Sequence, residues 1–519
     1  MKLLRPDGTI KTRRGIRPVL LAGGLAGLSV GGPAFAQILP QQTDPDAGGP
    51  TGLQITPSIG VSELFTDNTA GTQSDQAQFV SQVSPGISIS GETAHAKINF
   101  NFIPSFVHFD NGGGKDRIDP SLNTDAHVTP LDNLTVDFQG YANQEDDSGN
   151  ASNQQGILVP TNNSILYYIG TVTPHYHTQY RDLATLDVSY GLSSTNTSVG
   201  GAKLPGLGIN STDTLGRNAL VSIGSADSFG RVSIRADFSQ TDNTGSGMNT
   251  SSTTGVETLS LTYHLNRTYS FSGTIGYQSI NYPASGPTAA YQSSGLTWTL
   301  GLTITPNDLS TIALGYGKQQ GAYNPTIQAG YSLGPRTNIS ASYLVTVQNQ
   351  LTASLQNLKY LVYDQFGNPI DSRTGLPFSA VNQSFGSQNL LFRDKPALVA
   401  LSHQFTRSTV TLTGQYEVRN SLSGVQQDSQ VLGATINYTR QFTPLVQGST
   451  SLGYTQNTSR TFGAPEQKSN SISLSGQILY NLSDTTTVDV VENFFKTTSN
   501  LSINNSQTQQ LTVGLRKSF

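Results

Sequence analysis

Apolar and polar residues alternate with a period of two in many short segments, and this pattern constrains the fold most strongly. Apolar residues occupy every second position in three clear examples: Val232, Ile234, Ala236 and Phe238; Leu296, Trp298, Leu300, Leu302 and Ile304; and Leu432, Ala434, Ile436 and Tyr438. Successive side chains of a β-strand point to opposite faces, so each segment has an apolar face and a polar face. Counted from about Leu53 to Phe519, the segments predict an all-β chain of about 22 strands, with a range of about 20–24.

The predicted connections alternate between short turns and longer stretches rich in Ser, Asn and Gly. The short turns are expected at 132–133, 265–268, 305–308, 334–336, 406–408 and 481–484. The longer stretches are 144–163, 193–210, 240–254, 280–291, 348–394 and 457–468. A soluble β-helix repeats a constant short coil, whereas an outer-membrane barrel alternates tight periplasmic turns with longer external loops. The sequence therefore predicts a closed antiparallel transmembrane β-barrel, with both termini in the periplasm of a Gram-negative cell.

The last ten residues form the most specific single signal in the chain. Leu511, Val513, Leu515 and Phe519 share one face of an alternating strand that ends on an aromatic residue. Such a strand is what the barrel-assembly machinery reads, so this machinery and outer-membrane lipid are the expected partners. An unpaired strand edge in hydrocarbon leaves backbone groups without hydrogen bonds, so the first strand must pair with the last.

The first 36 residues have the three parts of a cleaved secretory signal peptide. A basic region ends at Arg17, an apolar stretch follows, and Ala34 and Ala36 supply the small residues expected at positions −3 and −1 before Gln37. A twin-arginine signal at residues 12–14 is the alternative, but a barrel cannot fold before it crosses the inner membrane. Residues 37–52 are then a periplasmic segment, and residues 53–519 form the barrel.

Composition excludes several other classes of protein. Hydrophobic residues make up 35 % and charged residues 12 %, but 21 Tyr and 21 Phe argue against disorder. Cysteine is absent, which excludes disulfides and thiolate metal sites. Loss of the signal peptide removes six positive charges and one negative charge, so the net charge falls from −4 to −9. A chain this acidic is not expected to bind nucleic acid.

A barrel of this size has a lumen that wall side chains alone do not fill. Large barrels are often energy-coupled transporters with a plug domain, but the roughly 16 residues of the 37–52 segment are too few for one. We therefore expect a lumen that is open or narrowed by loops. In the longest connection, 348–394, the residues Leu351, Leu355, Leu358 and Val362 fit one face of a helix. Asp371 and Arg373 follow in a turn-rich stretch. This segment is either a gate or an ordered external cap.

Two segments resemble a known family. The opening stretch contains Pro57, Ser58, Glu63 and Phe65, followed by Thr66, Asp67 and Asn68, and residues 367–377 are similar to a second stretch of that family. The family comprises outer-membrane β-barrel porins and includes proteins associated with exopolysaccharide and PEP-CTERM gene clusters. The resemblance is loose over the mature chain and specific over about 14 residues. It implies a barrel linked to polysaccharide secretion, without a defined substrate.

The sequence contains no constellation that points to catalysis. His175 and His177 lie two apart on one strand face, but no third metal ligand is visible nearby, and residues 145–147 are best explained as a solvated acidic loop. Neither a Gly-x-Ser-x-Gly elbow nor a phosphate-binding loop is present. We therefore expect no enzymatic activity, no cofactor and no metal.

The polar faces of the strands give the best indication of function. They consist largely of Ser, Thr, Asn and Gln, with scattered charges such as Arg231, Arg235 and Asp237. Such a wall suits hydrated, weakly charged solutes such as sugars. Two hypotheses follow: a pore for polar solutes or one linked to exopolysaccharide secretion, and a structural or glycan-binding barrel without transport activity.

Overall fold

The computed structural model describes most of the chain that follows the predicted signal peptide. The described residues are 52–68, 77–110, 116–146, 164–199, 212–226, 229–246, 251–284, 289–358, 360–363, 369–372, 378, 391–422, 427–461, 465–500 and 505–519. The predicted cleavage site at Ala34, Ala36 and Gln37, and the segment up to residue 51, lie outside them.

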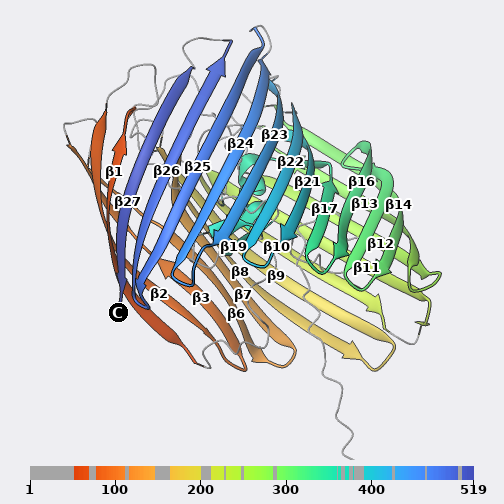
Figure 1. Cartoon of the computed structure of the whole chain (residues 1–519). Coiled ribbons are helices and arrows are strands. Elements are labelled where there is room, and N and C mark those ends of the chain that lie inside the picture. The colour runs from red at the N-terminus through yellow and green to blue at the C-terminus, as the bar shows by residue number, and fades with distance from the viewer. Residues whose placement is uncertain are drawn as a thin grey trace, which may run out of the picture.

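The described strands form a closed antiparallel barrel of 22 strands, as the sequence predicts (Figure 1). The first half comprises β1 (Gln54–Thr66), β2 (Gln78–Glu92), β3 (Ala96–Phe102), β4 (Ser105–Phe109), β5 (Arg117–Asp119), β6 (Leu122–Leu131), β7 (Leu134–Asp146), β8 (Ser164–Tyr180), β9 (Ala184–Val199), β10 (Thr212–Ser225), β11 (Val232–Ser246), β12 (Ser252–His264) and β13 (Tyr269–Tyr282). The second half comprises β14 (Tyr291–Asn307), β15 (Ser310–Gln319), β16 (Ala322–Gly334), β17 (Thr337–Tyr343), β18 (Thr346–Gln348), β21 (Phe392–Gln404), β22 (Ser408–Ser421), β23 (Gln427–Gln441), β24 (Val446–Thr461), β25 (Gln467–Ser483), β26 (Thr486–Ser499) and β27 (Ser506–Ser518).

Three strands of the barrel are each built from two segments. β3 continues into β4, β5 into β6 and β17 into β18, so the 25 segments of the sheet make 22 strands. Helix α1 (Gln350–Leu358) and a separate hairpin of β19 (Leu361–Tyr363) and β20 (Pro369–Asp371) lie between β18 and β21. No helix among the described residues is long and apolar enough to span a membrane.

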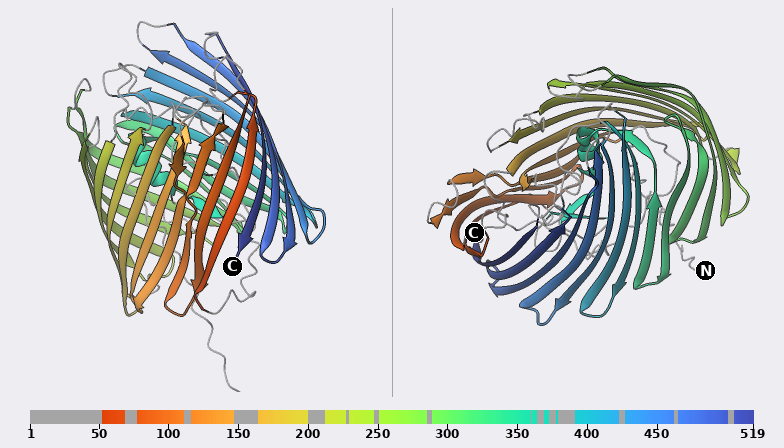
Figure 2. Two further views of the ribbon diagram at one scale, coloured as in Figure 1. Left: turned by 90° about the vertical axis from the view of Figure 1, so that its left-hand side faces the viewer. Right: turned by 90° about the horizontal axis from the view of Figure 1, so that it is seen from above.

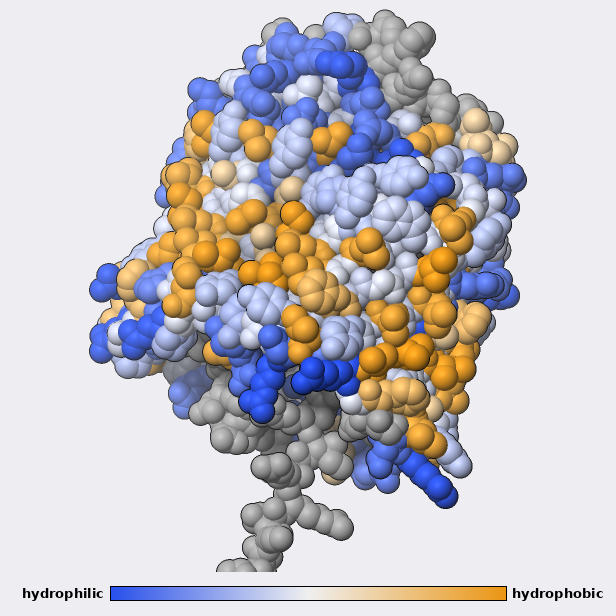
Figure 3. Space-filling model, turned by 90° about the vertical axis from the view of Figure 1, so that its right-hand side faces the viewer, coloured by the Kyte–Doolittle hydropathy of each residue, from blue (hydrophilic) through white to orange (hydrophobic). Residues whose placement is uncertain are grey.

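The outer face of the barrel is apolar and the inner face is polar. Leu296 and Leu300 on the outer face of β14 are 57 % and 65 % exposed. Apolar side chains gather in zones on the outer surface (Figure 3). Thr299 lies between these two residues in the sequence and points inward, and it is 9 % exposed. Apolar exposure on this scale is favourable only against lipid, because in water it would cost about 25 cal/mol for each Å².

Several strands extend further than the sequence predicts. β9 runs to Val199 and β11 to Ser246, so parts of the expected loops 193–210 and 240–254 are strand. These extensions lie at the end opposite the short turns, where the Ser/Asn/Gly-rich composition suggests a loop. A strand beyond the hydrocarbon layer keeps its backbone pairing but no longer requires an apolar outer face, so its alternation disappears.

One of the connections at this long-connection end also differs from the expected pattern. β15 and β16 are joined there by only Gln320 and Gly321, both with positive φ (49° and 74°). This backbone conformation is that of a tight two-residue hairpin turn. Short and long connections therefore alternate less regularly than the sequence suggests.

Prolines explain why two strands near the start of the barrel are interrupted. β3 and β4 are separated by Ile103 and Pro104, and the register places Pro104 between Pro85 of β2 and Pro120. The Ile103 N–H donates to the Ser121 carbonyl, so residue 104 would direct its N–H towards β2. Neither Pro104 nor Pro85 has an N–H, and the ladder between these strands is broken at that level.

The barrel closes where β1 pairs with β27. Nine residue pairs join the two strands, from Ser58 opposite Ser518 to Thr66 opposite Gln510. Beyond the ends of the paired stretch, the Phe519 N–H donates to the Pro57 carbonyl (2.9 Å). The beginning of β1 and the end of β27 therefore lie at the same end of the barrel, the end with the short turns.

The first prediction tests this closure with cysteines, because the chain contains none of its own. Ser58 and Ser518 are register partners between hydrogen-bonded positions, where opposing side chains approach most closely. We expect the double variant Ser58→Cys and Ser518→Cys to form an intramolecular disulfide, detected as a shift on non-reducing electrophoresis. Ser62→Cys with Ser518→Cys is the control, four residues out of register. Equal cross-linking of both pairs, or of neither, would contradict the seam.

Candidate functional site: the lumen and its inward loop

The opening motif and the last strand, which the sequence singles out separately, meet at the seam of the barrel. At the long-connection end, Asp67 accepts a hydrogen bond from the Gln509 backbone N–H (2.7 Å). The Asn68 side chain donates to the Gln507 carbonyl (2.9 Å), and the Asn68 N–H donates to Thr66 Oγ1 (3.3 Å). These three motif residues therefore hold β1 to the first residues of β27, which is a structural role in barrel closure.

The remaining motif residues are divided between the two faces of β1. Phe65 lies on the outer face and packs against Phe79 of β2, with ring centroids 5.2 Å apart. Glu63 shares this outer face and accepts a hydrogen bond from Ser81 Oγ (2.8 Å). Ser58 faces the lumen, where Arg516 donates to its hydroxyl (3.2 Å). The predicted outer residues of β27 (Leu511, Val513 and Leu515) are each exposed by 41–48 %, as is expected of a lipid-facing row.

The described parts of the long connection lie inside the barrel. Seen along the barrel axis, α1 lies within the ring of strands (Figure 2, right). Leu358 at the end of α1 and Phe378 pack against Tyr141 of β7 and against Tyr167 and Ile169 of β8. All five side chains are almost completely buried, and the rings of Tyr141 and Phe378 meet edge to face with centroids 5.2 Å apart.

The loop reaches this wall from a distant part of the barrel. It leaves from β18 and returns to β21, whereas β7 and β8 lie nine to eleven strands away around a wall of 22 strands. The wall positions contacted are therefore almost half a circumference from the loop's own origin. A segment that starts on one side and packs on the other must narrow the lumen.

The base of the loop is held by a second apolar cluster and by a buried group of charges. Val347 and Leu391 pack with Ile280 and Tyr282 of β13. Beside them, Gln348 donates to Asp394 (2.9 Å). Arg419 lies 2.8 Å from Glu417 and 3.7 Å from Asp394, and its guanidinium covers the Phe392 ring at 4.3 Å.

Helix α1 begins with a side-chain cap and is shorter than predicted. Asn349 Oδ1 accepts hydrogen bonds from both the N–H and the hydroxyl of Thr352 (2.8 Å each), which satisfies a free donor of the first turn. Leu355 and Leu358 lie on the helix and pack with the wall cluster, and Leu351 also lies on it.

Val362, the fourth residue of the predicted helical stripe, lies instead in β19, opposite Ile370 of β20. A β-branched residue next to a stretch rich in turn formers favours a hairpin over another helical turn. Asp371 pairs with Leu361 in this hairpin, and Arg373 lies outside the described residues.

Polar side chains line the inner wall below the loop. Hydroxyl and amide groups predominate on β22 to β24, where the inward positions include Thr409, Thr411, Thr413, Gln415, Thr435, Asn437, Thr439, Ser449 and Ser451. Arg235 and Asp237 face the lumen as an ion pair with a 2.7 Å contact. Arg231 precedes β11 and is exposed.

The two histidines considered as metal ligands also face the lumen, and each is close to an aspartate. His175 lies 3.1 Å from Asp137, and His177 contacts Asp187. Among the described residues, no group of three or more His, Asp or Glu side chains has a geometry that could hold a metal ion. Glu145 and Asp146 end β7, and Asp147 lies outside the described residues.

Comparison with known proteins supports the fold alone. No protein-family model matches the chain, and no curated protein matches its sequence. The iron transporter FrpB from Neisseria meningitidis (F3-3 variant) is similar in structure, with a TM-score of 0.51 and 9 % identity over 89 % of this chain and 81 % of FrpB. The siderophore receptor PirA from Acinetobacter baumannii matches with a TM-score of 0.48 and 10 % identity over 91 % of this chain and 81 % of PirA. The fold is that of a large outer-membrane β-barrel.

The second prediction concerns the docking of the loop on the wall. Truncation of a buried leucine costs about 2–5 kcal/mol, so Leu358→Ala should weaken the contact with Tyr141 and Tyr167. We expect a cysteine at Ala353, which is buried on α1, to react with a maleimide at least about tenfold faster in the Leu358→Ala background. The control is Leu300→Ala on the lipid-facing surface, which should leave the labelling rate unchanged. An unchanged rate with Leu358→Ala would show that this contact does not hold the loop.

Proposed function

We propose that the protein is an outer-membrane pore for hydrated polar solutes and that the 348–394 connection sets the width of its passage. The observation that carries this proposal is the packing of Leu358 and Phe378 against Tyr141, Tyr167 and Ile169, across the lumen from where the loop starts. A barrel of 22 strands has an interior wide enough for an aqueous passage, and an inward loop is the element that limits it.

The surface chemistry of the barrel supports an outer-membrane location. The outer face is apolar at positions such as Leu261, Ile275 and Leu296, whereas the inner face carries hydroxyl and amide groups. A closed barrel leaves no unpaired strand edge in the hydrocarbon layer. We propose that the short-turn end, where Phe519 lies, faces the periplasm and that the long connections face the outside.

The resemblance of the opening motif to porins associated with exopolysaccharide clusters suggests a narrower role. In this proposal, the solute is a polysaccharide or a fragment of one. An uncharged wall of Thr, Ser, Asn and Gln side chains can exchange hydrogen bonds with sugar hydroxyl groups at little cost, since water already makes the same bonds. A neutral oligosaccharide that enters such a pore should interrupt the ion current.

The third prediction tests both the pore and the constriction. Gln348 and Phe392 are register partners, so residues 349–391 can be replaced by an Asn-Gly turn that continues the hairpin. We expect the purified barrel to form ion-conducting channels in planar bilayers, and the loop-deleted variant to have a higher single-channel conductance because the segment across the lumen is gone.

The matched control removes another connection at the same end of the barrel, the one between β24 and β25. Ser459 and Gln467 are also register partners, so residues 460–466 can be replaced by the same turn, and the conductance should not change. A folded, inserted barrel that never conducts would refute the pore and favour a structural or glycan-binding barrel. Conductance that is unaffected by removal of 349–391 would refute the constriction alone.

A further inference from the structure

A row of ionisable side chains crosses the inner wall near the short-turn end. We call the lumen belt the following eight residues: Glu92, Lys97, Asp125, His127, Asp137, His175, His177 and Asp187. They come from β2, β3, β6, β7, β8 and β9, which are consecutive strands of the wall. The sequence reveals only the pair on β8, because the other members are brought beside it by strand pairing.

The register places most members of the belt directly opposite one another. The opposed pairs are Glu92 with Lys97, Lys97 with His127, His127 with Asp137, and His177 with Asp187. His175 reaches Asp137 diagonally (3.1 Å), and His127 reaches the other carboxylate oxygen of the same residue (2.6 Å). One aspartate therefore accepts hydrogen bonds from two imidazoles.

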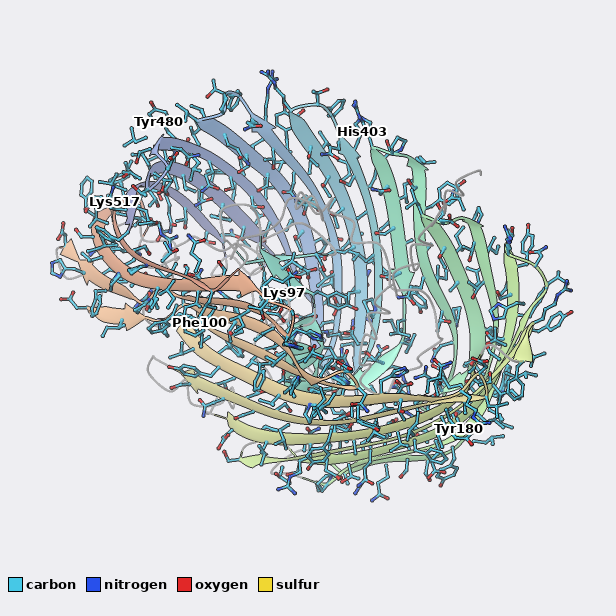
Figure 4. The ribbon with its side chains drawn as sticks, turned by 90° about the horizontal axis from the view of Figure 1, so that it is seen from below. Lys97, Phe100, Tyr180, His403, Tyr480 and Lys517 are labelled. Carbon is cyan, nitrogen blue, oxygen red and sulfur yellow. The ribbon has the colours of Figure 1, made fainter. Side chains whose placement is uncertain are left out.

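These groups face an interior that water can enter. Apolar residues of the same strands, such as Phe138 and Tyr176, are exposed on the outer face, and the belt occupies the alternate positions. The side chains of His127 and His177 are half exposed, and Asp137 is 40 % exposed. Lys97 lies on the inner side of the wall when the barrel is viewed from the short-turn end (Figure 4).

The belt occupies only one side of the lumen. The inward positions of β22 to β24 at this end are Thr, Ser, Asn and Gln, without charges. The neighbouring strand β10 has no ionisable residue on its inner face within the described residues 212–226. Among the described residues, the other ionisable groups of the strands that face this part of the lumen are Arg235 and Asp237 on β11, His264 on β12, Asp489 on β26 and Arg516 on β27.

We infer that the lumen belt makes the pore selective for cations near neutral pH and that its three histidines cancel this preference as the pH falls. The inference rests on the proposed pore. With neutral histidines, four carboxylates face one ammonium group, so the belt carries a net charge of −3. Protonation of His127, His175 and His177 adds three positive charges, which brings the belt close to neutrality.

The physical basis is the local concentration of ions beside the wall. One unit charge about 6 Å from a permeating ion in water changes the local ion concentration about threefold, before screening by salt. Histidine is the side chain whose ordinary charge change falls between about pH 5 and about pH 8. Any protonation of the carboxylates at lower pH also makes the belt less negative. No member of the belt therefore opposes the loss of negative charge.

The fourth prediction is measured as a reversal potential in planar bilayers under a KCl gradient. The purified wild-type barrel should prefer K⁺ to Cl⁻ at about pH 8, and the permeability ratio should fall at least about threefold by about pH 5. Asp137→Asn should lower the ratio at about pH 8. Replacement of His127, His175 and His177 together by Gln should keep the cation preference at about pH 5.

The control is His403→Gln, because His403 lies on the outer face of β21 and bonds to Thr337 (2.6 Å) away from the lumen. Its selectivity should follow that of the wild type at both pH values. Channels whose selectivity does not change with pH, or a triple variant that behaves as the wild type does, would overturn the lumen belt and leave the pore standing. Absence of any channels would instead overturn the proposed function.

Discussion

The structure depends on the requirement that every backbone N–H and C=O within a membrane has a partner. For a chain of strands, this requirement is met only when the first strand pairs with the last. Here the β1–β27 seam meets it with nine residue pairs, and further hydrogen bonds secure both ends: those of the Asp67 and Asn68 side chains at one end, and that of the Phe519 backbone at the other. The motif that resembles a porin family therefore has a structural role, which is to close the barrel wall.

The wall has a local defect close to this seam. Pro85, Pro104 and Pro120 lie side by side on three adjacent strands and break the ladder locally. Above the break, Leu64, Val80, Val107 and Phe109 point inward and form a small apolar cluster of their own. The lost backbone bonds are thus accompanied by additional apolar burial on the inner face, in a part of the barrel where inward positions would otherwise be polar.

The sequence predicts the features that belong to a single strand or segment. It does not predict the features that depend on which strands pair. Alternation gives the strand number and the outward rows, because the period of two is a property of each strand alone. It does not give strand ends beyond the hydrocarbon layer, as Val199 and Ser246 show, since no environment there imposes an apolar face. The helical stripe identifies Leu355 and Leu358, but Val362 follows the β19–β20 hairpin instead. The partners of His175 could not be found at all, because Asp137 and His127 are adjacent to it only through register.

The inward loop contacts the same part of the wall that carries the lumen belt. Tyr141, which the loop contacts, and Asp137 of the belt lie on one inner row of β7, four residues apart and therefore about 13 Å. The loop starts beside the uncharged wall of β22 to β24 and crosses to the charged side, so it narrows the passage between the two sides. Screening at physiological salt limits the reach of the belt to about 8 Å. Small ions that pass near the belt feel its charge, whereas a larger neutral solute is in contact mainly with hydroxyl and amide groups. One lumen can therefore discriminate between ions by charge while it remains permissive for uncharged polar solutes.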